Sequence, residues 1–244
     1  MKKIPTLFKR VFDEHHHKSI TKEVTPGCEV VLEGKTISTV KWDGACCAII
    51  GGEIYKRYDA KQKYGKKPPE GAIPCQKEPD PITGHWPHWV KCEQSKPEDK
   101  YFFEAFNRYK SGMHPDEFSK FLCSDNEIRT YEAIGPAWQG NPYKLKYNQL
   151  IRHGDDVILA IEDGIFRICK DLDGNRVEKI YTLLHDFLKE KRIEGVVFWF
   201  NSSPICKIKR SDFGFVWPPK DGEAESSQSI FSVHLTGIPK QELV

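Results

Sequence analysis

A lysine that precedes a turn is the first feature of the sequence that could do covalent chemistry. Lys41-Trp42-Asp43-Gly44 follows a β-branched segment, and Asp-Gly is a common turn signal. A lysine amine attacks a phosphorus or carbonyl centre only when it is deprotonated, and burial or nearby cations lower its pKa enough to allow this. A surface lysine beside a hairpin turn has the same local sequence, so the tetrapeptide alone leaves both interpretations open.

Two later segments carry charges that such a nucleophile could use. Glu194 opens an apolar strand, where a carboxylate is suited to hold a divalent metal, although an ordinary helix-to-strand loop reads the same way. Lys207 and Lys209 are two residues apart, so on a strand their ammonium groups project from one face. Two such groups repel each other unless an anion such as a triphosphate lies between them; a solvated edge strand is the alternative.

Basic and aromatic residues also alternate between positions 56 and 67. Arg57, Lys61 and Lys63 are interleaved there with Tyr58 and Tyr64. Arginine and lysine bind backbone phosphates, and tyrosine can stack on a base, so the stretch is a candidate contact for RNA or for ATP phosphates. A solvated charged loop is the alternative interpretation.

The elements that must position these residues are mostly strands. Apolar and β-branched runs predict strands over residues 29–32, 36–40, 45–50, 100–107, 128–134, 195–200 and 205–208. Helical spacing predicts helices over residues 115–122 and 177–191, and a long proline-rich loop spans residues 61–86. Many strands and few helices indicate an α+β fold, and the sequence has neither a GxGxxG nor a Walker-type phosphate loop.

Composition limits the class of protein. The chain has 244 residues, of which 39% are hydrophobic and 12% aromatic, and this composition is typical of a globular protein. Its net charge of only +2 excludes histone-like binding, so any contact with nucleic acid must come from a local cluster. No export signal or membrane-spanning apolar run is visible, so we expect a cytoplasmic protein whose eight cysteines are reduced.

The cysteines suggest little metal chemistry on their own. Cys75 and Cys92 flank two histidines without the spacing of a zinc finger, so no zinc site is favoured there. Cys46 and Cys47 are adjacent on a predicted strand, so one must face inward and the other outward. We expect the inward cysteine to pack in the core.

Taken in order, four segments of this chain resemble the covalent nucleotidyltransferases, which include polynucleotide ligases and messenger-RNA capping enzymes. The segments are KxDG at 41–44, a carboxylate-bearing strand at 130–135, EGxV at 194–197 and KxK at 207–209. Residues 41–47 also resemble the KxDGTCC segment of an RNA ligase family of bacteria, phages and animals, with alanine at position 45. The similarity continues through residues 131–135, 140–143, 150–154 and 215–218, and covers the chain from about residue 6 to 218.

This resemblance implies an ATP-dependent RNA ligase with a nucleotidyltransferase fold, whose antiparallel sheets surround an ATP cleft. Lys41 would take AMP from ATP and pass it to an RNA 5′-phosphate, and a 3′-hydroxyl would then displace the AMP. The implied ATP-binding residues are Val40, Lys41, Asp43, Gly44, Arg57, Glu132, Glu194, Lys207 and Lys209. Glu132 and Glu194 would hold Mg²⁺ (or Mn²⁺), and Arg57, Lys61 and Lys63 would contact RNA.

The expected organisation is one catalytic domain over residues 1–218 and a tail over 219–244, which either docks on that domain or stays loose. Because only residues 210–244 follow KxK, we expect no added oligonucleotide-binding domain, which weakens the DNA ligase and capping interpretations. Two alternatives remain open: a capping-type guanylyltransferase and an RNA-end binding module that has lost catalysis. No protein partner and no membrane contact are implied.

Overall fold

Antiparallel sheets form most of the computed structural model, which describes residues 3–14, 18–61, 64–81, 83–113, 128–171 and 174–224. One sheet has six strands in the order β6-β7-β5-β4-β8-β9, a second has three in the order β11-β10-β3, and β1 and β2 form a hairpin. Neighbouring strands within each sheet pair antiparallel. The predicted α+β class with antiparallel sheets is therefore confirmed.

The six-stranded sheet carries a helix on one face. Its strands are β4 (Ala45–Ile50), β5 (Glu53–Ala60), β6 (Ile73–Pro74), β7 (Trp86–Lys91), β8 (Arg129–Ile134) and β9 (Gln149–Arg152). Helix α1 (Lys100–Ser111) covers one face, where Phe102 and Phe106 pack against Cys47 and Tyr131. Because side chains alternate along a strand, Cys46 and Glu132 lie on the opposite face.

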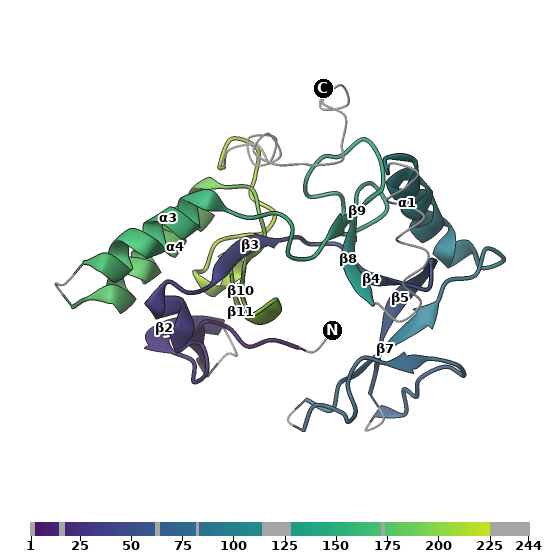
Figure 1. Cartoon of the computed structure of the whole chain (residues 1–244), viewed down its shortest axis with the longest axis horizontal. Helices are drawn as coiled ribbons and strands as arrows, with labels where there is room; N and C mark the ends of the chain where they lie inside the picture. The colour runs from purple at the N-terminus through teal and green to yellow at the C-terminus, as the bar shows by residue number, and fades with distance from the viewer. Residues whose placement is uncertain are drawn as a thin grey trace.

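The three-stranded sheet is built from β3 (Ile37–Lys41), β10 (Gly195–Phe200) and β11 (Ser203–Lys209). Val40, Val196 and Ile208 lie opposite one another in the three strands, and all are buried. They pack in one core with residues of α3 (Leu159–Lys170) and α4 (Arg176–Glu190), which lie together along this sheet (Figure 1). The hairpin of β1 (Phe8–Phe12) and β2 (Lys18–Val24) also contacts α4.

Most of the predicted elements near the chemically informative residues are confirmed. The strands predicted over 36–40, 45–50, 128–134, 195–200 and 205–208 correspond to β3, β4, β8, β10 and β11, and the helix over 177–191 corresponds to α4. The helix predicted over 115–122 lies outside the described residues. None of the helices in the described ranges combines the length and the apolar character needed to cross a membrane.

Two predicted strands are wrong. Residues 29–32 belong to a short 3-10 helix, η1 (Glu29–Glu33), which ends at Gly34 in the left-handed region at a φ of 67°. Residues 100–107 form the first part of α1. The aromatic residues there favour a strand by propensity, but Phe102, Ala105 and Phe106 have helical spacing and are all buried, so packing on the sheet decides the structure.

The first residues after position 218 contact the rest of the chain. Asp221 forms an ion pair with Lys144 at 2.6 Å and lies 3.4 Å from a guanidinium nitrogen of Arg192. These contacts lower the pKa of Asp221, chiefly through the hydrogen bond from Lys144. The remainder of the predicted tail, residues 225–244, lies outside the described residues.

Candidate functional site

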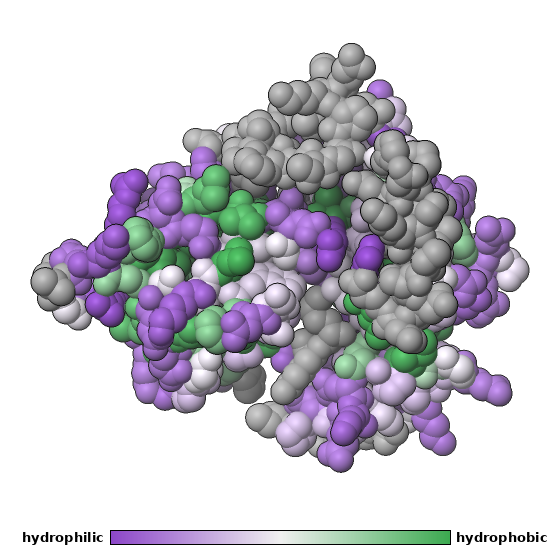
Figure 2. Space-filling model, viewed as in Figure 1, coloured by the Kyte–Doolittle hydropathy of each residue, from purple (hydrophilic) through white to green (hydrophobic). Residues whose placement is uncertain are grey.

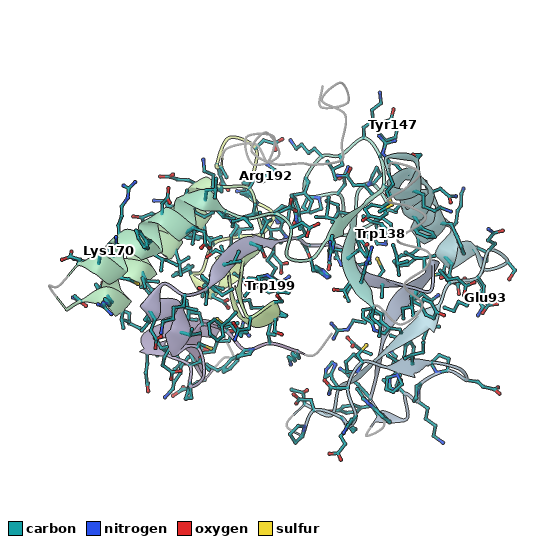
Figure 3. All side chains as sticks on the ribbon, viewed as in Figure 1. Glu93, Trp138, Tyr147, Lys170, Arg192 and Trp199 are labelled. Atoms are coloured by element: carbon teal, nitrogen blue, oxygen red, sulfur yellow. The ribbon has the colours of Figure 1, made fainter. Side chains whose placement is uncertain are left out.

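A cavity of about 340 Å³ lies between the six-stranded and the three-stranded sheets. Lys41 and Lys207 line it from the three-stranded sheet, and Cys46, Arg57 and Glu132 line it from the six-stranded sheet. Trp199, labelled in Figure 3, also contributes to the wall. The surface is largely hydrophilic on the face drawn in Figure 2. The chain runs directly from β3 into β4 through residues 42–44, so the predicted nucleophile lies where the two sheets meet (Figure 1).

The register of the three-stranded sheet brings the predicted lysines together. Gly195 in β10 lies opposite both Lys41 in β3 and Lys209 in β11. All three residues therefore share one face, with a residue that has no side chain between the two lysines. The glycine is required here, because a Cβ at Gly195 would lie 2.1 Å from the carbonyl oxygen of Ile208.

A single buried carboxylate connects the two lysines. Glu194 is only 6% exposed, and its two oxygens accept hydrogen bonds from the ammonium groups of Lys41 and Lys209. Lys207 projects from the same face as Lys209, and it lines the cavity. Three ammonium groups thus lie near two carboxylates, those of Glu194 and Asp43, so this end of the cavity has an excess of positive charge that suits an anion.

The excess of positive charge also affects the pKa of Lys207. Burial lowers the pKa of Lys207 to about 8, and the neighbouring ammonium groups of Lys41 and Lys209 contribute to the shift. The carboxylate of Glu194 opposes it. An anionic ligand placed between these lysines would therefore relieve their repulsion.

The Asp43-Gly44 turn is held by groups from three distant parts of the chain. The Asp43 N–H donates to the hydroxyl of Tyr143 at 2.6 Å, and the indole N–H of Trp217 donates to the Asp43 carboxylate at 2.8 Å. The Gly44 N–H donates to Glu132 Oε1 at 3.0 Å. Burial raises the pKa of Asp43, while the bond from Trp217 opposes that shift. These contacts fix the backbone that carries Lys41.

The residues on either side of Lys41 are also held in place. The buried Trp42 donates its indole N–H to the Asp156 carboxylate at 2.7 Å, and burial raises the pKa of Asp156 to about 6. The Val40 N–H donates to the carbonyl of Asp156 at 3.0 Å, and the Val40 side chain packs in the core. That N–H already has a partner, so contact between ATP and Val40 stays a prediction for its other backbone atoms.

Glu132 lies among groups other than those expected. Its Oε2 atom is 3.1 Å from His153 Nε2, and His153 Nδ1 is 3.0 Å from the hydroxyl of Thr130. Cys46, Glu132 and His153 form the one group of three possible metal ligands found among the described residues, with ligand atoms within 4.8 Å of one another. Glu194 is not a member of that group, so joint metal binding by Glu132 and Glu194 stays a prediction.

Of the three predicted RNA-binding residues, Arg57 lines the cavity and Lys61 does not. Arg57 lines the cavity, and its guanidinium pairs with the Asp59 carboxylate at 3.0 Å. Lys61 lies beyond the end of β5 in a backbone-bonded turn with Lys66, outside the cavity lining. Lys63 lies outside the described residues. Arg57 therefore lines the same cavity as Lys41, whereas Lys61 lies just beyond the end of β5 and outside that lining.

Several side chains that support the site are not identified by any local sequence pattern. Tyr143, Trp217 and His153 lie in segments that carried the family resemblance, but no role was assigned to them. Their position in those segments is the one signal in the sequence that could point to them. Their hydrogen-bond partners lie far away in the sequence, so no local pattern reveals the contacts. Asp156 had no such signal. Cys47 packs in the core as expected of the inward cysteine, and Cys46 faces the cavity.

Comparison with known proteins gives one consistent result. The sequence model of the RNA ligase 1 family matches residues 74–241, which is more than half of the chain. Among curated proteins, RNA ligase 1 of Pongo abelii is 28% identical over 163 residues, and RNA ligase 1 of Mus musculus is 27% identical over 164. Each alignment covers 63% of this chain and 48% of the relative, so the chain spans about half the length of these relatives.

Proposed function

Because the chain belongs to the RNA ligase 1 family, we propose that it is an ATP-dependent RNA ligase and that Lys41 is its nucleophile. The substrates would be an RNA 5′-phosphate and an RNA 3′-hydroxyl. We further propose that the two sheets form a nucleotidyltransferase fold, with ATP in the cavity between them. The capping-type and non-catalytic alternatives are less favoured by this family membership.

One observation carries the proposal. Lys41 precedes the segment that matches the family, whereas Glu194 and Lys209 lie inside that segment. The fold nevertheless joins the Lys41 ammonium to the Glu194 carboxylate, whose other oxygen binds Lys209. A lysine nucleophile for nucleotidyl transfer needs cations beside it, because charge develops on the leaving pyrophosphate. Lys207 and Lys209 supply such cations.

The proposed chemistry has three steps. The Lys41 amine attacks the α-phosphorus of ATP, a nitrogen–phosphorus bond forms, and the bond to pyrophosphate breaks. The RNA 5′-phosphate then attacks the lysyl-AMP phosphorus and Lys41 leaves, which gives RNA-adenylate. Finally the 3′-hydroxyl attacks the RNA 5′-phosphorus and AMP leaves. Before the first step Lys41 must lose a proton, and Glu194 Oε2 already accepts a hydrogen bond from its ammonium.

Glu194 is the residue best suited to a magnesium ion. Mg²⁺ binds proteins through one or two carboxylates together with substrate phosphates, and Glu194 offers a buried carboxylate beside the proposed phosphate site. When bound, the ion would neutralise phosphate charge. Glu132 lies beside a thiol and an imidazole, which are poor magnesium ligands, so it is less suited than Glu194 to hold that ion.

The test is intact-protein mass spectrometry after incubation with ATP and Mg²⁺. We expect a gain of one AMP on the unmodified protein and none on Lys41→Ala or Lys41→Arg. Lys35→Ala is the matched control, because Lys35 is an exposed lysine paired with Glu33. Protein that is already adenylated when purified should lose AMP on addition of pyrophosphate.

The same experiment separates the alternatives. A gain of GMP from GTP would support a guanylyltransferase instead. Absence of any adduct, together with no loss on addition of pyrophosphate, would leave the RNA-end binding module as the better account. If the adduct forms, joining of a 5′-phosphorylated RNA to an RNA 3′-hydroxyl tests the remaining two steps.

A further inference from the structure

The six-stranded sheet presents three potential metal ligands of different chemistry to the cavity. We propose that Cys46, Glu132 and His153 bind a borderline-soft divalent metal, for which Zn²⁺ is the best match. The site is separate from the magnesium position proposed at Glu194. It depends only on the geometry of the sheet and stands whether or not the chain is a ligase.

The sheet places the three ligands on neighbouring strands. Cys46 in β4 and Glu132 in β8 lie directly opposite each other, so their side chains point to the same side. His153 follows β9 immediately, and its backbone N–H bonds to the carbonyl of Thr130 at 3.0 Å. Thr130 is two residues before Glu132 on β8, so the imidazole reaches the carboxylate diagonally across the strands.

The distances are close to those of an occupied site. Zinc bonds of about 2.0–2.3 Å in a tetrahedron place the ligand atoms about 3.3–3.6 Å apart. His153 Nε2 and Glu132 Oε2 are already 3.1 Å apart, and all three ligand atoms lie within 4.8 Å of one another. The cluster therefore needs a shift of only about 1 Å to surround the ion.

Outer hydrogen bonds aim two of the ligands at the centre of this group. His153 Nδ1 lies 3.0 Å from the Thr130 hydroxyl, which leaves Nε2 directed toward Glu132. Glu132 Oε1 accepts the Gly44 N–H, which leaves Oε2 directed toward His153. Such partners normally fix the orientation of metal-binding histidines and carboxylates.

The donor set selects the class of metal. A thiol and an imidazole together are poor ligands for Mg²⁺ and good ligands for Zn²⁺. Burial raises the pKa of Cys46 to about 12, so metal binding would displace a proton from a neutral thiol. Arg57 lies against this thiol, but its pairing with Asp59 offsets its charge. Three ligands leave a fourth position for a water or a ligand in the cavity.

The direct test is titration of the full chain with Co²⁺ followed by absorbance, then displacement by Zn²⁺. We expect tetrahedral cobalt bands and a thiolate-to-cobalt charge-transfer band. Cys46→Ser should lose the charge-transfer band and bind at least about 100-fold more weakly, because even loss of an outer partner costs about 10- to 100-fold. Thr130→Val removes the outer partner of His153, so it should bind Co²⁺ about 10- to 100-fold more weakly than the unmodified protein.

Cys75→Ser is the matched control, since Cys75 is a partly buried thiol outside the ligand group. It should bind cobalt like the unmodified protein and keep the charge-transfer band. Equal binding by Cys46→Ser would overturn the site, as would a cobalt complex of the unmodified protein without that band. The second criterion decides the question even if Cys46→Ser fails to fold, and His153→Gln provides a further ligand variant.

Discussion

At the scale of single residues, the site combines charges that the folded chain tolerates poorly. Lys207 is a cation beside two other ammonium groups, and burial lowers its pKa to about 8 from an ordinary value of 10.5. Glu194 is the carboxylate that opposes this repulsion, and both of its oxygens bind other lysines. An anion bound between these lysines would relieve the repulsion.

Because of this repulsion, we expect Lys207→Met to stabilise the ligand-free protein. Between pH 8 and 10.5 the unfolded chain binds more protons at Lys207 than the folded chain, so stability rises with pH through that window. Below pH 8 the penalty is complete. We expect Lys207→Met to be more stable by about 1–3 kcal/mol at pH 7, with a difference that shrinks toward pH 10.5. Urea unfolding at both pH values measures this.

Lys35→Met is the control for that measurement, because Lys35 is exposed and pairs with Glu33 at the surface. It should change stability little at either pH. A difference between Lys207→Met and the unmodified protein that stays constant from pH 7 to 10.5 would contradict the assigned cause. If the proposed function holds, the same variant should also adenylate Lys41 more slowly.

At the scale of elements, the segment after β11 supports the turn that follows Lys41. Trp217 donates to the Asp43 carboxylate at 2.8 Å and packs on Tyr143 with ring centroids 5.7 Å apart. Tyr143 in turn accepts the Asp43 N–H. The Asp43-Gly44 turn therefore depends on a residue that lies 174 positions later in the chain, Trp217.

Trp217→Phe tests this positioning role. The variant keeps an aromatic ring against Tyr143 and loses the hydrogen bond to Asp43. A hydrogen bond to a charged group contributes about 1.5–3 kcal/mol, so we expect the single-turnover rate of Lys41 adenylation to fall by about 10-fold or more. The apparent Kd for ATP should change much less, which a merely structural defect would not produce.

Trp86→Phe is the matched control, since it loses an indole bond to the Gln76 carbonyl at 2.9 Å. It should unfold at a temperature similar to that of Trp217→Phe, and it should adenylate at nearly the normal rate. Equal rates for the two variants would argue against a role for Trp217 in holding the turn.

The elements also show what sequence can and cannot predict here. Strand β4 and helix α4 can be predicted from local patterns. Each buries one face, and this places its apolar residues at the spacing of a strand or a helix. Helix α1 does not follow from its local pattern, because residues 101–103 are aromatic and favour a strand, and packing on the sheet decides for the helix. The contacts of Asp43 with Tyr143 and Trp217 span 100 and 174 positions, so no local pattern could place them.

At the scale of the whole molecule, the site lies between two separate hydrophobic cores. One core joins the three-stranded sheet to α3 and α4 and also includes Ile134 of β8 and Ile151 of β9, and the other joins the six-stranded sheet to α1. Lys41 and Lys207 belong to the first unit, whereas Arg57 and Glu132 belong to the second. A ligand bound in the cavity would therefore contact residues of both sheets, and it would stabilise the folded chain if it bound only that state.

The near-neutral net charge makes the proposed attraction to RNA a local property. The turn after β5 presents two lysines beside tyrosine rings: the Lys66 ammonium lies 4.7 Å from the ring centre of Tyr58, and that of Lys61 lies 5.9 Å from Tyr64. Tyr64 is 71% exposed, so its ring is available to stack on a base. Neither ammonium pairs with a carboxylate within the described ranges.

We expect the double variant Lys61→Gln/Lys66→Gln to bind single-stranded 5′-phosphorylated RNA more weakly and with less dependence on salt. Each lost phosphate contact should reduce the slope of log K against log salt by about 0.7, which gives about 1.4 for the pair. The control Lys22→Gln/Lys179→Gln removes the same charge from lysines paired with Glu178 and Asp171 on the side of α4. If both double variants reduced the slope equally, RNA attraction would follow net charge, and the turn after β5 would have no special role.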